Sequence, residues 1–262
     1  MGLESPPKLT QNLTYEYLLP FKSDLVDKKI RYKTNEKYWY ALHRSREITM
    51  FETPKIITAE ISFGCNMTYD TKNLYHNTKC YTILFNDVYV RFTQAYLTIL
   101  NSRILWYYLS QTGYTLRGGF FCFKTKYLEP FHLPDLTSPE NKDIAESLSD
   151  FADTMLSLNS QLQDKRNHFQ HRLSDNLEGV KITSALQTFD TMDFKGFVAE
   201  LKKQKIKLSL SQQDEWEEYF NKRVAECREL SAQIKATDEK IDNRVFDLYG
   251  LTEEERRIVM EG

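Results

Sequence analysis

Apolar residues recur at helical spacing through the second half of the chain. They form two stripes in which the steps are mostly three and four residues, and each stripe can cover only one face of a helix. A helix with a single narrow apolar face gains most of its stability by packing against a neighbour. Two stripes of similar length therefore predict an antiparallel, coiled-coil-like helical hairpin. The first stripe is Ile144, Leu148, Phe151, Met155, Leu158, Leu162 and Phe169, and the second is Trp216, Phe220, Val224, Cys227, Leu230, Ile234, Ile241, Val245 and Leu248.

Capping residues indicate where the two long helices begin. Ser138-Pro139-Glu140 offers an N-cap, a proline in the first turn and an acidic side chain near the positive end of the helix dipole. Ser211 is the predicted cap of the second long helix. Residues 176–210 between them predict a short helical insertion with a helix over 194–204. Its lysines are interpreted as a solvated end of the hairpin and not as a DNA contact; they are Lys202, Lys203, Lys205 and Lys207.

The first half of the chain predicts shorter and mixed elements. Residues 55–62, 80–85 and 120–124 are rich in β-branched and aromatic side chains, which favours strands. Residues 94–109 place apolar side chains on one helical face, and Gly113 is expected to end that helix. The predicted fold class is α+β, with a mixed α/β domain over residues 1–135 and the helical hairpin over residues 136–262.

A basic turn follows the predicted helix of residues 94–109. Leu116-Arg117-Gly118-Gly119 contains two glycines, which admit positive φ and let the backbone approach a partner closely. Arg117 is displayed on this turn, and Lys124 and Lys126 follow it. Arginine and lysine on such a turn suit phosphates and base edges.

Charge divides the chain at the same place as the predicted elements. Residues 1–135 hold 17 Lys+Arg against 12 Asp+Glu, a net of +5, and residues 136–262 hold 18 against 25, a net of −7. The first half is therefore the expected electrostatic footprint for a nucleic acid, although the whole chain carries a formal charge of −2. A difference of this size is also within ordinary surface variation, so charge alone does not decide the matter.

The run of residues 97–134 resembles the C-terminal part of a target recognition domain. Such domains occur in TaqI-like DNA adenine methyltransferases, in type IIG restriction-modification enzymes and, more distantly, in type I specificity subunits. The segment YLEPFHLP at 127–134 looks like the strand that closes these domains before a long helix. FETPKII at 51–57 with EIS at 60–62 is similar to their early strand, and residues 241–255 resemble the usual end of type IIG chains.

This resemblance implies sequence-specific recognition of double-stranded DNA. A rigid domain would insert loops into the major groove, where arginine pairs with guanine and asparagine or glutamine pairs with adenine, while lysines and backbone N–H groups bind phosphates. Tyr107, Tyr108 and Tyr114 are expected to support the core and not to stack on bases. The candidate DNA-binding residues are Arg117, Gly118, Gly119, Lys124, Lys126, Arg44, Arg46, Lys72 and Asn73.

Catalytic motifs are absent from the sequence. Adenine methyltransferases carry an Asn/Asp-Pro-Pro-Tyr motif that grips the flipped adenine and a glycine-containing loop for S-adenosylmethionine, and the chain has neither. We therefore expect the chain to be the specificity end of a larger enzyme and to bind no cofactor itself. S-adenosylmethionine, and Mg²⁺ if the parent cleaves DNA, are expected in an upstream methyltransferase domain or subunit.

Metal sites and membrane segments are not expected either. His168 and His171 lack a third ligand, and the order Pro134-Asp135 with Glu140-Asn141-Lys142 is too tightly spaced for the strands of a metal-dependent nuclease. The four cysteines show no Cys-x-x-Cys pairing, and no apolar run approaches the roughly 20 residues that cross a bilayer. The expected location is the cytoplasm of a bacterium or archaeon.

Two other functions fit part of the sequence. A helical protein-interaction module with a small globular head would show the same apolar stripes. An RNA or single-strand binder would use the aromatic residues to stack on bases. Binding to duplex DNA that weakens steeply with salt distinguishes these possibilities from the recognition domain.

Overall fold

The structure is a computed structural model that describes residues 13–31, 39–40 and 47–262. Its contacts divide the chain into two compact units, Met1–Glu52 and Thr53–Gly262. Among the described residues, no helix combines the length and apolar character needed to cross a bilayer.

The first unit is mostly helical where it is described, with Trp39 and Tyr40 in a turn. Its side-chain contacts centre on Trp39, which is buried and lies 5.6 Å from the ring of Tyr15 and 5.7 Å from that of Tyr40. The ammonium of Lys22 lies 5.7 Å from the Trp39 ring. Its elements are α1 (Leu13–Leu18), the 3₁₀ turn η1 (Leu19–Phe21), α2 (Lys22–Arg31) and α3 (Thr49–Glu52).

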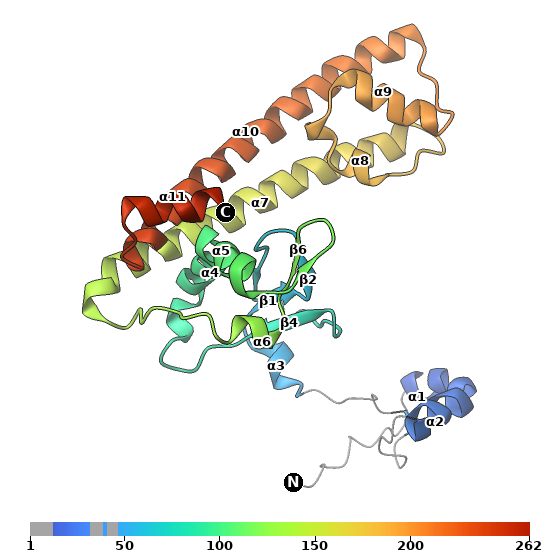
Figure 1. The fold of residues 1–262 in the computed structure, drawn as a ribbon. Coiled ribbons are helices and arrows are strands. Elements are labelled where there is room, and N and C mark those ends of the chain that lie inside the picture. Colours follow the sequence, from blue (N-terminus) through green and yellow to red (C-terminus); the bar gives the residue numbers. More distant parts are fainter. Residues whose placement is uncertain (1–12, 32–38, 41–46) are drawn as a thin grey trace. The chain divides into compact units, whose positions relative to one another are not determined.

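Two small antiparallel sheets form the β part of the second unit (Figure 1). In the first sheet β1 lies between β3 and β4, and in the second β6 lies between β2 and β5. The strands are β1 (Lys55–Ala59), β2 (Ile61–Ser62), β3 (Thr68–Asp70), β4 (Cys80–Ile83), β5 (Thr115–Leu116) and β6 (Phe120–Cys122).

Glu60 joins the two sheets. The strand predicted over residues 55–62 is divided at this position, because β1 pairs in one sheet and β2 in the other. The backbone N–H of Glu60 donates to the carbonyl of Lys79, and its carbonyl accepts from the N–H of Phe123. The backbone of this one residue therefore links the residue before the start of β4 to the residue after the end of β6.

The helix predicted over residues 94–109 is wrong as a single element. The structure has α4 (Thr93–Asn101) and α5 (Arg103–Thr112), with Ser102 in an extended conformation between them. The carboxylate of Asp242 accepts a hydrogen bond of 2.9 Å from the backbone N–H of Arg103, the first residue of α5. The side chain of Asn101 exchanges two hydrogen bonds with the backbone of Met67. Residues distant in sequence thus form hydrogen bonds with residues on both sides of the break. The predicted end of α5 at Gly113 is confirmed.

The segment of residues 127–134 is not the strand that the resemblance implies. It contains the end of α6 (Thr125–Leu128) and then a loop that buries Phe131. The hydroxyl of Tyr96 donates to the carbonyl of Pro134, which fixes this loop against α4. The chain passes through the 3₁₀ turns η3 (Val90–Phe92) before α4 and η4 (Pro139–Asn141) after the loop.

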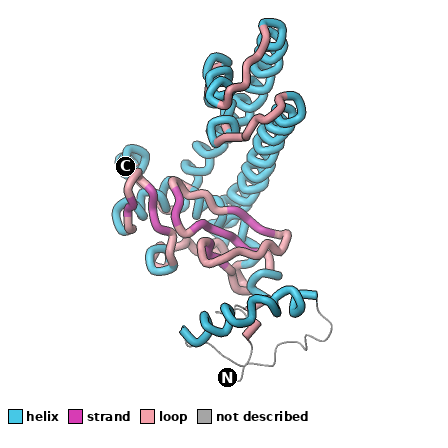
Figure 2. Tube along the Cα trace, turned by 90° about the vertical axis from the view of Figure 1, so that its right-hand side faces the viewer, coloured by secondary structure: helices cyan, strands magenta, loops and turns pink. Residues whose placement is uncertain are grey.

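A long antiparallel hairpin completes the second unit and confirms the α+β fold class. α7 (Lys142–Asn176) runs away from the sheets, and α10 (Leu210–Leu248) returns beside it (Figure 1 and Figure 2). The predicted caps differ from those observed. Ser138 precedes η4 without a side-chain cap bond, and Ser209, not Ser211, caps α10 through a reciprocal pair of bonds with Gln212.

Two apolar clusters lie along the hairpin. The one near the sheets contains residues of α4, α5, α7 and α10, so the mixed part and the hairpin share a core. The predicted domain boundary at residue 135 stays a prediction. The C-terminal helix α11 (Glu253–Glu261) contributes Val259 to this cluster and packs against α5.

The second cluster lies at the far end of the hairpin, where α8 and α9 are drawn in Figure 1. Arg166 of α7 donates two hydrogen bonds to the buried carboxylate of Asp190, at 2.8 and 2.7 Å. Arg228 of α10 donates to the carbonyl of Asp190 as well. The insertion is therefore fastened to both long helices. Its elements are α8 (Ser184–Gln187), η5 (Phe189–Thr191) and α9 (Phe194–Lys203).

Candidate nucleic-acid interface

The double-glycine turn connects β5 to β6. Gly118 and Gly119 have φ values of 89° and 78°, the left-handed region that favours glycine. The N–H of Gly119 donates to the carbonyl of Leu116 at 3.2 Å and closes the turn. Leu116 and Phe120 face each other across the ladder, so the turn projects from paired strands.

Arg117 is exposed on this turn. Among the described residues, none forms a hydrogen bond, ion pair or ring contact with its guanidinium. A guanidinium has five N–H donors in a planar fork that matches two acceptors on a guanine edge or a phosphate. Arg117 therefore has its full donor set available to a partner.

Aromatic side chains support the turn from one side. The ring of Phe63 lies 5.8 Å from that of Phe120 and 5.9 Å from that of Trp106. Trp106 in turn meets the buried Phe121 edge to face at 4.4 Å. A β-carbon at Gly119 would lie 3.2 Å from the Phe63 ring, so glycine allows this close packing. The turn thus has a rigid base connected to the core.

Lys124 is not free, because Glu60 holds it. One carboxylate oxygen of Glu60 lies 3.2 Å from the Lys124 ammonium, and the other lies 3.1 Å from that of Lys79. The hydrogen bonds from Lys79 and Lys124 lower the pKa of Glu60, and the bond to Glu60 raises the pKa of Lys124. Sequence reasoning missed Lys79 because only the pairing of β1 with β4 brings it beside Glu60.

Lys126 follows on α6 with a different environment. Its ammonium lies 4.5 Å from the centroid of the Tyr127 ring, a cation–π contact that leaves the residue exposed. Within the described ranges no carboxylate pairs with it. Its positive charge is therefore available to a phosphate.

The loop that carries Lys72 and Asn73 is fixed by a buried carboxylate. Asp70 accepts the backbone N–H groups of Lys72 and Leu74, both at 2.8 Å, and pairs with the fully buried ammonium of Lys55. Burial alone would raise the pKa of Asp70, but the hydrogen bonds from Lys55 and the two N–H groups outweigh burial and lower it. Asn73 adopts a positive φ of 58° in this loop.

The structure places the predicted residues on two sheets. Arg117, Gly118 and Gly119 occupy the β5–β6 turn, and Lys72 and Asn73 follow β3 of the other sheet. Lys124 comes together with Lys79 at the junction of the sheets. Arg44 and Arg46 lie outside the described residues. The contacts of all these candidate residues with DNA stay predictions.

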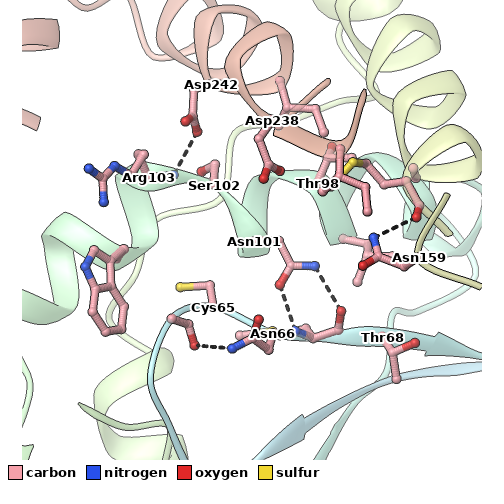
Figure 3. A pocket seen from close by; sticks show the side chains of 18 of the residues that line it. Cys65, Asn66, Thr68, Thr98, Asn101, Ser102, Arg103, Asn159, Asp238 and Asp242 are labelled. Carbon is pink, nitrogen blue, oxygen red and sulfur yellow. Dashed lines mark hydrogen bonds between the residues drawn. The ribbon is translucent and has the colours of Figure 1, made fainter. Parts of the chain in front are cut away.

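A cavity of about 750 Å³ lies between the β2–β3 loop, the α4–α5 break and the hairpin (Figure 3). Asp242 enters it from α10 and bonds to the N–H of Arg103. Burial raises the pKa of Asp242 to about 6, and burial also raises the pKa of the Cys65 thiol to about 12. A thiol with so high a pKa is a poor nucleophile. Within the described ranges, no group of three or more metal-ligating side chains occurs.

Comparisons with known proteins match two separate parts of the chain. Residues 141–245 match a domain of unknown function, DUF8810. The chain is 26% identical over 150 residues to the type II methyltransferase M.XhoI of Xanthomonas vasicola, covering 56% of this chain and 26% of that protein. The chain thus spans about a quarter of this relative's length. Residues 14–133 match the TaqI-like C-terminal specificity domain, which confirms the resemblance inferred from the sequence.

Proposed function

We propose that this chain is the sequence-specific duplex-DNA recognition module of a restriction-modification DNA methyltransferase. The observation that carries the proposal is Arg117, an exposed arginine with no partner among the described residues, on a closed turn that aromatic packing supports. The match to a specificity domain over residues 14–133 supports the same role. A helical protein-interaction module does not require this turn.

The proposed contacts are of two kinds, those with base edges and those with phosphates. Arg117 enters the major groove and pairs with O6 and N7 of a guanine, and the glycines beside it let the backbone approach the DNA. Lys124 and Lys126 bind phosphates and set the register of the protein on the duplex. Lys79 acts with Lys124, and Lys72 and Asn73 contact the DNA from the β3–β4 loop.

The hairpin spaces the recognition part from a methyltransferase domain or subunit and docks onto it. We place S-adenosylmethionine, and Mg²⁺ if the parent cleaves, in that catalytic part. The parent is proposed to be a cytoplasmic type IIG or related adenine methyltransferase. The 262-residue chain alone is expected neither to methylate nor to cut DNA, and methyl transfer by the purified chain would contradict this division of labour.

Selection from a random duplex library tests the function. The chain is incubated with the library at low salt, because a detached recognition domain lacks the clamp of the catalytic part. Enrichment of one defined motif, with affinity that falls steeply as salt rises, is the expected result. Equal retention of every duplex sequence, or preferential retention of single strands or RNA, would contradict the proposal.

A further inference from the structure

Two phenylalanine rings beside the basic turn are exposed although they are apolar. The side chain of Phe63 is 64% exposed and that of Phe120 is 41% exposed. Isolated exposed apolar residues are ordinary, but here two rings contact each other at 5.8 Å. An apolar pair that is held together and left open to solvent is a feature of a binding surface.

Both rings are held in place by the surrounding structure. The amide of Asn66 donates to the carbonyls of Phe63 and Gly64, at 2.9 and 3.2 Å, which fixes the loop that carries Phe63. Phe120 is held by strand pairing, because it lies opposite Leu116 in the β5–β6 ladder. The rings therefore form a rigid apolar ridge, defined here as Phe63 and Phe120.

The ridge shares its turn with Arg117. Phe120 comes three positions after Arg117, and the Phe63 ring lies so near Gly119 that a β-carbon there would be 3.2 Å from it. The exposed positive charge of Arg117 complements the negative charge of a duplex. Among groups in the major groove, the 5-methyl of thymine is the one that offers an apolar surface, and phenylalanine contacts it readily.

We infer that Phe63 and Phe120 read the 5-methyl group of a thymine next to the base that Arg117 contacts. This inference rests on the proposed function and adds a second kind of base to the site. It assigns specificity to two residues that the polar candidates from the sequence do not include. Arg117 supplies hydrogen bonds to one base pair, and the ridge supplies apolar contact to its neighbour.

Replacement of thymine by deoxyuridine tests the inference, because it removes only the methyl group and leaves base pairing intact. The selected duplex is altered at one thymine at a time, and its Kd is measured for the full chain. When the thymine that contacts the ridge is replaced by deoxyuridine, the native chain should bind the duplex about fourfold more weakly. This is the factor expected for losing the burial of one methyl group. In the Phe120→Ala and Phe63→Ala variants, the same replacement should leave the Kd almost unchanged.

Two further variants separate contact from folding. Phe120→Leu keeps an apolar side chain and should retain part of the deoxyuridine penalty. Leu210→Ala removes a 77% exposed apolar side chain at the start of α10 and should leave the full penalty in place. Circular dichroism and thermal unfolding confirm that each variant is folded.

The remaining outcomes each overturn one claim. A penalty that persists in both phenylalanine variants, or a selected motif without any methyl-sensitive thymine, would overturn the inference and leave DNA recognition intact. An equal loss of affinity for every duplex would assign the ridge to the sugar-phosphate backbone instead. A library that yields no motif would overturn the proposed function itself.

Discussion

The carboxylate of Glu60 and the ammonium of Lys124 lie 3.2 Å apart where the two sheets of the second unit meet. The same carboxylate binds Lys79 through its other oxygen, so one negative charge holds two positive ones in place. The group as a whole keeps a positive charge that a phosphate can use. Glu60 thus fixes the position of the Lys124 ammonium, whereas the sequence alone shows only that Lys124 follows the double-glycine turn.

Removal of either lysine should weaken DNA binding without regard to sequence. Lys124→Ala and Lys79→Ala are expected to lower the affinity for cognate and unrelated duplexes by similar factors and to reduce the salt slope by about one. Glu60→Gln, which releases both ammonium groups, should raise the affinity for all duplexes. Fluorescence anisotropy at several salt concentrations measures these changes. A Lys124→Ala loss confined to the cognate site would show that Lys124 reads a base.

The buried pair of Lys55 and Asp70 should stabilise the sheet and its polar loop. Asp70→Ala leaves the Lys55 ammonium buried without its carboxylate, which costs about 3–5 kcal/mol for buried pairs of this kind. It also frees the N–H groups of Lys72 and Leu74. Urea unfolding measures the loss, and hydrogen exchange should rise in the loop after β3. Unchanged stability would contradict this account of the pair.

The pH dependence of this pair follows from the lowered pKa of Asp70. A carboxyl with a depressed folded pKa contributes stability above its unfolded pKa, about 3.9, and loses it as pH falls through the folded value. In the native chain, the contribution of this pair should therefore persist at neutral pH and disappear only in strong acid.

Asp242 should behave in the opposite way. Burial raises its folded pKa to about 6, with nearby Asp238 acting in the same direction and the bond from the Arg103 N–H opposing them. A carboxyl whose folded pKa is raised stabilises the fold while it is protonated, so stability should decline as pH rises from about 4 to about 6.

The substitution Asp242→Asn removes this decline. The amide oxygen of the introduced asparagine can still accept the N–H of Arg103. The stability of the variant relative to the native chain should rise by about 2–3 kcal/mol as pH goes from about 4 to about 7. Thermal unfolding across this range measures the difference, with the exposed Asp214→Asn as the control. A difference that does not change with pH would exclude Asp242 as its source.

The far end of the hairpin depends on Arg166 and Asp190. Arg166→Met leaves the buried Asp190 carboxylate without its bidentate partner, and the expected cost is about 3 kcal/mol. Lys142→Met breaks an exposed pair with Glu146 and should cost less than about 1 kcal/mol. Hydrogen exchange in α8 and α9 should increase only in the first variant. Equal effects of the two substitutions would contradict the clamp.

Local patterns predicted the elements that depend on local chemistry. The apolar stripes indicated both long helices, and the double glycine indicated a turn, which has two positive φ values. They could not predict the break at Ser102, because the acceptor for the Arg103 N–H comes from Asp242, 139 positions along the chain. The same limit applies to Glu60, whose division between two sheets depends on Lys79 and Phe123.

The site follows the same rule. The exposed Arg117 could be proposed from its neighbours in sequence, since glycine and arginine are adjacent there. The partners of Lys124 could not, because Glu60 and Lys79 reach it only through strand pairing. The Phe63 and Phe120 ridge could not be proposed either, since apolar residues in a strand pattern are expected to be buried and exposure is a property of the folded chain.

The comparison of Arg117→Ala with Lys126→Ala tests DNA reading by the turn most directly. It is made on the selected site and on unrelated duplexes, in the full-length parent or with this chain at low salt. Arg117→Ala should cost about 1–3 kcal/mol on the cognate site and much less on unrelated DNA, whereas Lys126→Ala should weaken both about equally. Unchanged cognate affinity in a folded Arg117→Ala variant would contradict the account and direct attention to Arg44, Arg46 and the loop of residues 66–79.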